Sequence, residues 1–511
     1  MNAGIRAGSR YAGGLLLIAL LFPGVRRADA CTGMYAGKGV TSDGSVLIGR
    51  TVDFSPYNAT MIQQICEAGT QVAFNGTLNR YRYVSVLKST ALSAGRYAGS
   101  AVNEKGLAVS ATVTGATRAA ALGNDPFVPL DHGGVGEPNL PDYLVGNAAS
   151  ASEAVMLMAK AIQQYGHSGP EIYLFADKNG AWYVEVYTGH VWAAVKMPAD
   201  KVAVFGNHFN LRAFDTSDTA NVVFSPRLVS HATGAGIAVW ADDERTKLDL
   251  YSTYADPSAT ETGFNNFRAW YGHRRFAPSD NLIYATNLVC ELFFTPDHEI
   301  APTNMFELMR ARYEDMSDDE LPTARTNAAI RVIGTTKQGS CQVLQLDCRE
   351  TTPDNMRGTI WSCLGQSEHG VFHPVNASQD YLPAAYTNDA QRTFGYDPNR
   401  AADAFRRLSA LAQSNRRWYG PGVRGYWRAD EARRAAEWPQ KLNEAIASGD
   451  TAALSCYTRA EEERSFADAK RLYDELLWYA AANNRISGDG SNATDEPEAP
   501  FSPSEDGREA R

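Results

Sequence analysis

The chain has 511 residues, of which 44% are hydrophobic, so it can bury one large core or two smaller ones. Its 48 basic and 58 acidic residues give a formal net charge of -10. Because no long basic stretch is present to neutralise phosphates, we expect no nucleic-acid partner. An acidic balance of this size is ordinary for a soluble protein and does not identify a substrate.

The first thirty residues predict a signal peptide. Arg6 and Arg10 precede an apolar run over 13–22, and residues 28–30 read Ala-Asp-Ala, the small-x-small pattern that signal peptidase accepts. About ten apolar residues are too few to span the ~30 Å hydrocarbon core of a bilayer, so we expect no stable membrane insertion. The pattern predicts export to the medium, the periplasm or the cell envelope, with Cys31 as the first residue of the mature chain.

From residue 31 onward, short runs of β-branched and aromatic residues bounded by Gly, Asn and Asp predict strands. Apolar spacing predicts helices among them. The strands are expected over 81–87, 106–113, 181–187, 340–347 and 358–364, and the helices over 151–162 and 300–314. Strands with interspersed helices indicate a layered α+β architecture for residues 31–395.

The C-terminal part of the chain has a different texture. Residues 396–485 are rich in Ala, Arg, Glu and Leu and predict long helices, one of them over 451–482. Residues 486–511 are mostly Gly, Ser, Pro, Asp and Glu, which cannot bury enough apolar surface to fold. We therefore predict a helical C-terminal region followed by a disordered acidic tail.

Cys31 is the candidate nucleophile. The chain has seven cysteines and no C-x-x-C pair, so a zinc ribbon or a thioredoxin-type site has no support. Six cysteines could pair in an oxidising compartment, which leaves one over. At the N-terminus of a mature chain, the α-amine has a reference pKa of about 7.7–8.0 and the thiol one of about 8.5. The amine of Cys31 can therefore serve as the general base for its own thiol.

A predicted turn brings two charged residues to Cys31. Asp43-Gly44 is a strong turn signal between two strand-like runs, and folding the chain there places Cys31 opposite residues 50–54. Asp53 is then positioned to hold the amine by a hydrogen bond. Arg50 is positioned to favour the thiolate and to contact a substrate carbonyl or carboxylate.

Other interpretations of Cys31 remain open at this point: a structural thiol, a disulfide partner or a lipid-attachment site. Lipid attachment is disfavoured by Arg26, Arg27 and Asp29, which separate the apolar run from the cysteine. No metal or other cofactor is expected. His369 and His373 have metal-like spacing, but the intervening glycine and the following proline argue against a helix, and we interpret them as loop histidines.

The opening motif resembles that of a known family. Cys31-Thr32, Gly37-Lys38, the Ser-Asp-Gly-Ser run over 42–45 and Arg50-x-x-Asp53 resemble the N-terminal-cysteine dipeptidases of the dipeptidase A type. These belong to the N-terminal nucleophile hydrolase superfamily and are similar to penicillin V acylases and bile salt hydrolases. Further matching segments follow in order over 103–109, 171–177, 181–185, 190–198, 206–209 and 359–364, so the resemblance spans roughly residues 31–385.

The resemblance implies a four-layer αββα fold for 31–395, with two antiparallel sheets between helices. It also implies that Cys31 acts as nucleophile and base together, with Arg50 and Asp53 around it. Asn207 resembles the side-chain donor of an oxyanion hole, although its residue type fits a turn after a strand equally well. A further arginine of the site corresponds to one of three candidates, which are Arg268, Arg274 and Arg275.

These observations predict an exported cysteine hydrolase that cleaves dipeptides. The same machinery would serve an N-acyl amide hydrolase, whose substrates are other small amides. A secreted or lipidated binding protein with a structural Cys31 is the alternative from a different class.

Overall fold

The computed structural model describes residues 31–54, 59–71, 75–90, 96–260, 264–285, 287–316, 330–389, 396–483 and 500–504. The predicted signal peptide and most of the predicted acidic tail lie outside these ranges. No helix among the described residues is long and apolar enough to cross a membrane.

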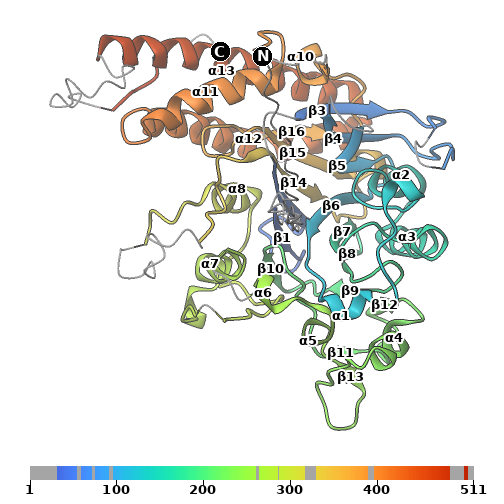
Figure 1. The fold of residues 1–511 in the computed structure, drawn as a ribbon. Helices are drawn as coiled ribbons and strands as arrows, with labels where there is room; N and C mark the ends of the chain where they lie inside the picture. Colours follow the sequence, from blue (N-terminus) through green and yellow to red (C-terminus); the bar gives the residue numbers. More distant parts are fainter. Residues whose placement is uncertain are drawn as a thin grey trace, which may run out of the picture.

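Two antiparallel sheets form the centre of the molecule (Figure 1). The six-stranded sheet has the order β10-β1-β2-β14-β15-β16, and the eight-stranded sheet has the order β12-β9-β8-β7-β6-β5-β4-β3. The strands of the first are β1 (Thr32–Ala36), β2 (Val46–Asp53), β10 (Val202–Phe205), β14 (Gln338–Leu346), β15 (Gly358–Leu364) and β16 (His373–Asn376). Those of the second are β3 (Ala59–Cys66), β4 (Tyr83–Thr90), β5 (Arg96–Asn103), β6 (Ala108–Thr114), β7 (Glu171–Asp177), β8 (Gly180–Val186), β9 (Trp192–Met197) and β12 (Val222–Phe224). The short strands β11 (Phe214–Asp215) and β13 (Lys247–Leu248) pair with each other.

Alternate residues of the central strands belong to different cores. Tyr35 and Ile48 lie in the core that includes residues of both sheets, whereas Met34 and Leu47 pack against helices on the other face. This period of two is the strand periodicity, and here both faces are covered. All eight residues of β2 are buried as a result.

Helices complete the outer layers. On the eight-stranded sheet lie α2 (Leu140–Asn147) and α3 (Ala151–Tyr165), and α3 begins where the Ser150 side chain accepts a hydrogen bond from the backbone N–H of Glu153. The six-stranded sheet carries α7 (Asn266–Phe276), α8 (Pro302–Arg310) and α12 (Gly420–Ser448). This arrangement confirms the predicted αββα layers (Figure 1). Shorter helices are α1 (Ala119–Leu122), α4 (Leu228–Gly234), α5 (Leu250–Tyr254), α6 (Pro257–Thr260), α9 (Asp354–Arg357) and α10 (Ala384–Thr387).

The predicted C-terminal helices are present as α11 (Ala401–Ser414), α12 and α13 (Thr451–Ala482). They share the buried core of the sheets. Leu408 of α11 and Leu472 of α13 belong to the same apolar cluster as Val375 of β16, and Trp438 of α12 packs against the Trp361 ring of β15. The helical region therefore packs as part of the same body as the sheets.

The prediction of a wholly disordered tail over 486–511 is wrong for residues 500–504. Phe501 is 4% exposed, its backbone N–H donates to the Trp418 carbonyl at 2.8 Å, and its ring packs edge-on against Tyr479. Ser504 hydrogen-bonds Glu475 of α13 through both its backbone N–H and its hydroxyl. The tail is polar on average, but the single aromatic side chain of Phe501 buries enough apolar surface to hold this segment against the helices.

Candidate active site

The first strand pair positions Cys31 as the sequence predicts. The turn at Asp43-Gly44 uses a glycine with φ of +72°, a conformation that side chains disfavour. The register pairs Thr32 with Thr51, so Cys31, one residue earlier, lies opposite Val52. The Thr32 backbone N–H also donates to the Thr51 hydroxyl at 3.0 Å, which reinforces that register.

The Cys31 thiol is buried and stays protonated unless a base is near. Only 7% of the residue is exposed, and this burial is the main cause that raises the pKa of the thiol above its ordinary value. The charges of Asp53 and Glu137 raise the pKa further, whereas Arg50 and the backbone N–H of Asp53 lower it. The groups with the strongest influence on this pKa include no histidine.

Asp53, the last residue of β2, has one oxygen engaged and one free. Arg331 donates to its Oδ2 at 2.5 Å, while its Oδ1 is buried without a hydrogen-bond partner. Burial raises the pKa of the carboxyl to about 6, although Arg331 and Arg268 lower it. Asp53 Oδ1 is therefore an acceptor, beside Cys31, that has no donor among the described residues.

Arg50 is almost completely buried and only partly satisfied. It is 1% exposed, and its Nη2 donates to Glu137 Oε1 at 3.3 Å. Its Nε and Nη1 atoms have no hydrogen-bond partner among the described residues. A buried guanidinium with unused donors requires an explanation, and a ligand for these donors is one.

Asn207 follows β10, and its side-chain orientation is fixed by Arg268. The guanidinium donates from Nη2 to Asn207 Oδ1 at 3.0 Å, so the amide nitrogen must point elsewhere, and this Nδ2 is buried without a partner. Arg268 also donates from Nη1 to the Cys31 carbonyl at 2.6 Å. One arginine thus links the nucleophile candidate to the oxyanion-hole candidate.

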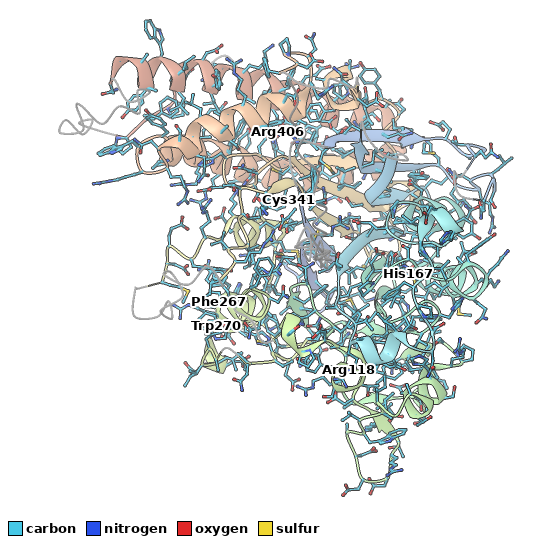
Figure 2. All side chains as sticks on the ribbon, viewed as in Figure 1. Arg118, His167, Phe267, Trp270, Cys341 and Arg406 are labelled. Atoms are coloured by element: carbon cyan, nitrogen blue, oxygen red, sulfur yellow. The ribbon has the colours of Figure 1, made fainter. Side chains whose placement is uncertain are left out.

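Of the three later arginines that the sequence leaves open, Arg268 is the one at this site. It is fully buried on α7, the helix on which Figure 2 labels Phe267 and Trp270. Arg275, further along the same helix, is 47% exposed in its side chain and pairs with Asp315. Arg331, Glu137 and Glu171 also reach the site region, and sequence analysis did not identify them.

The cysteines and histidines away from the site differ from expectation. All seven cysteines are free, so the structure contains none of the disulfides that six of them could form. His369 lies in the loop before β16, as predicted, whereas His373 is the first residue of β16, so the prediction of a loop is wrong for His373; both side chains are buried. Among the described residues, no group of three His, Cys, Asp or Glu side chains is arranged to hold a metal ion.

Comparison with known proteins gives a consistent family. The model of peptidase family C69 matches residues 30–428. A probable dipeptidase of Salmonella dublin is 26% identical over 70% of this chain and 83% of its own length. A probable dipeptidase B of Streptococcus pyogenes serotype M1 is 28% identical over 72% of this chain and 76% of its own.

Among solved structures, a mutant of the conjugated bile acid hydrolase from Clostridium perfringens is 13% identical, with a TM-score of 0.30, over 72% of this chain and 97% of that chain. The match to the family model covers most of the chain and begins one residue before Cys31. The chain belongs to peptidase family C69.

Proposed function

We propose that this peptidase hydrolyses dipeptides, with Cys31 as the nucleophile and its own α-amine as the general base once residues 1–30 are removed. One observation carries the proposal. Three buried side chains around the Cys31 position each have an atom that finds no hydrogen-bond partner in the described part of the chain, and these atoms are Arg50 Nη1, Asp53 Oδ1 and Asn207 Nδ2. Their chemistry matches what an N-terminal cysteine and a bound peptide carbonyl would need.

The free amine solves the problem of the buried thiol. Because burial raises the thiol pKa, a base must take its proton, and an amine on the same residue is held next to it. Asp53 Oδ1 would accept a hydrogen bond from that amine and fix its orientation. Arg331 holds the other oxygen of the same carboxylate, which keeps Oδ1 available.

The reaction then proceeds in two stages. The amine accepts the thiol proton, the sulfur attacks the peptide carbonyl carbon, and the carbon–nitrogen bond breaks as the proton passes to the departing amino acid. A water molecule, deprotonated by the same amine, attacks the resulting thioester. The carbon–sulfur bond then breaks, the second product leaves, and the amine returns the proton to the sulfur. Arg50 stabilises the thiolate electrostatically during both stages.

Asn207 would stabilise the charge on the attacked carbonyl oxygen. Its Nδ2 is a donor held in place by the contact between Arg268 and Asn207 Oδ1. Removal of one such donor typically costs about 10²–10³-fold in kcat. Asn207 would therefore touch the reacting oxygen, whereas Arg268 is a positioning residue.

The relatives named dipeptidases support peptides of two residues as the substrates. The Ala-Asp-Ala sequence before Cys31 supports cleavage by signal peptidase, and hence export. Intact-mass analysis of protein recovered from an exporting host tests whether cleavage occurs directly before Cys31. An active enzyme whose mature chain begins anywhere other than Cys31 would overturn it.

The substrate is tested with purified mature protein on a panel of dipeptides and a matched panel of N-acyl amino acids. We expect hydrolysis of the dipeptides, and we expect Cys31→Ser to reduce it by more than about 1,000-fold because a hydroxyl is far harder to ionise than a thiol. Cys66→Ser is the control, because Cys66 is equally buried and accepts a hydrogen bond from Asn79 that serine can keep. Hydrolysis of N-acyl amino acids alone would identify an acylase instead.

A further inference from the structure

Two glutamates lie beside Arg50 on the side of the eight-stranded sheet. Glu137 precedes α2, and its Oε1 accepts from Arg50 Nη2 at 3.3 Å. Glu171 opens β7, and its Oε2 accepts from the Glu137 backbone N–H at 3.1 Å and from the Tyr173 hydroxyl at 2.6 Å. The hydrogen bond from the Glu137 backbone to Glu171 keeps the two residues next to each other.

The second carboxyl oxygen of Glu171, Oε1, is available to a ligand. Among the described residues, nothing hydrogen-bonds Glu171 Oε1, while Oε2 is fully engaged. A Cβ on Gly169 would meet Glu171 Oε1 at 3.9 Å and no other atom within 4 Å, whereas a Cβ on Gly136 would lie only 2.2 Å from the Ser168 hydroxyl. The open space beside Oε1 is therefore on the Gly169 side, where a ligand could lie.

Among the described residues, the pair has one cationic partner for its two carboxyl groups, which is Arg50. His167 lies 3.4 Å from Glu171 Oε2, but burial lowers its pKa to about 4, so it is neutral at neutral pH (Figure 2 labels it beside α3). Burial, and then the charge of Glu137, raise the pKa of Glu171 to about 8. Glu171 therefore holds a proton at neutral pH, and a second cation bound beside it would favour its ionised form.

The pair is close to the reacting centre. The charge of Glu137 raises the pKa of the Cys31 thiol, and Arg50, which Glu137 contacts, lowers it. In a dipeptide, the α-ammonium is attached to the carbon next to the scissile carbonyl. A substrate with that carbonyl at Cys31 therefore carries its ammonium into the neighbourhood of the pair.

We propose that Glu137 and Glu171 bind the free α-ammonium of the substrate's first residue, with Glu171 Oε1 as an acceptor. This inference rests on the proposed dipeptidase function and deepens it. The buried Arg50, with two donors unused, keeps Glu137 in place and faces the same bound molecule. The site thus selects peptides with an unblocked N-terminus and rejects those whose amine is acylated, since an amide brings no charge and leaves the carboxylates unpaired.

The test compares alanyl-alanine with N-acetyl-alanyl-alanine on the mature wild-type protein, on Glu171→Gln and on a Glu137→Gln/Glu171→Gln double variant. Wild-type protein should prefer the free dipeptide by about 100-fold or more in kcat/KM. The double variant should lose about 100-fold on the free dipeptide, mainly through KM, so that its preference for the free over the acetylated dipeptide largely disappears. Glu67→Gln, which changes a glutamate that is 68% exposed, is the matched control.

The outcomes separate this inference from the function on which it rests. Wild-type protein that cleaves both substrates equally well, or variants that lose both equally, would overturn the ammonium site and leave the dipeptidase intact. Wild-type protein that cleaves neither substrate would overturn the dipeptidase and the inference with it. Because glutamine has the shape of glutamate, unchanged thermal midpoints will show that the variants are folded.

Discussion

Two buried arginines, Arg50 and Arg434, show how a binding group differs from a structural one in this protein. Arg434 of α12 has no exposed surface, and each of its nitrogens is engaged: Nε with Glu461, Nη1 with the Phe372 carbonyl and Nη2 with the Ser465 hydroxyl. Arg50 is just as buried, yet within the described ranges two of its three nitrogens have no hydrogen-bond partner.

The difference indicates which contacts offset the free-energy cost of burying each guanidinium. The guanidinium of Arg434 is satisfied inside the fold, where it joins α12 to α13 and to the chain before β16. That of Arg50 is satisfied only in part, so the remaining donors are available to thiolate and substrate. Asp53 and Asn207 repeat this pattern, because each has one polar atom held by an arginine and the other free.

Replacing each arginine by methionine tests whether Arg50 serves activity and Arg434 serves stability. Arg50→Met should lower kcat/KM by about 1,000-fold with little change in thermal midpoint, since thiolate and substrate lose their cation. Arg434→Met should leave kcat/KM within about threefold but cost about 3–5 kcal/mol of stability, because Glu461 and Asp430 lose a buried partner. Steady-state kinetics of both variants measure the change in kcat/KM, and urea unfolding measures the change in the free energy of unfolding. Equal losses of activity and stability in both would remove the distinction.

Asn207→Ala tests the same idea at the oxyanion position. We expect kcat to fall by about 100-fold with KM nearly unchanged, because the Nδ2 donor acts on charge that develops only in the transition state. Arg268→Lys should show a smaller loss of the same kind, since lysine cannot hold both the Cys31 carbonyl and Asn207 Oδ1. An unchanged kcat in Asn207→Ala would mean that the free amide serves no catalytic purpose.

Asp53 makes activity and stability respond to pH in opposite directions. Its folded pKa of about 6 lies above the ordinary aspartate value, so the folded state holds the proton more tightly than the unfolded chain does. The stability that this proton contributes is complete below pH about 4 and is lost as the pH rises through 6. Activity requires the ionised form, so kcat/KM should fall about fivefold between pH 6 and pH 5 as the ionised fraction of Asp53 falls. Asp53→Asn should lose activity and also lose the pH dependence of stability between pH 4 and 6. Retention of that dependence would assign it to another group.

Phe501→Ala should have the smallest effect on activity and a clear one on stability. The side chain is buried against Tyr479, far along the chain from the site, so its removal should cost about 3 kcal/mol and leave kcat/KM unchanged. Pro500→Ala, at the exposed neighbouring residue, is the control. If both variants melt like wild type, the tail does not stabilise the fold.

The sequence was informative where the site is local. Cys31, Arg50 and Asp53 lie within a single hairpin, so turn chemistry and strand periodicity were enough to bring them together. Asn207 could be named, but its role could not be told from that of a turn residue, because the contact that orients its amide comes from α7.

The residues that the sequence did not predict depend on contacts between segments that are distant along the chain. Arg331 and Asp53 are 278 residues apart, and no local pattern predicts such a pair. Glu137 and Glu171 are ordinary charged residues in the sequence, and they form a pair only because β7 places Glu171 beside the loop before α2. Phe501 was hidden in a polar tail because composition describes a segment and not one anchoring side chain.

The most direct test of the account adds one residue ahead of Cys31 and changes no side chain. Mature protein with an additional N-terminal methionine, confirmed by mass, should lose about 1,000-fold in kcat/KM because an amide cannot accept the thiol proton. A matched protein with a protease-cleavable leader should regain full activity when cleavage exposes Cys31, which excludes misfolding as the cause. Wild-type rates from the methionine-extended protein would contradict the account, because the α-amine would then not be the base.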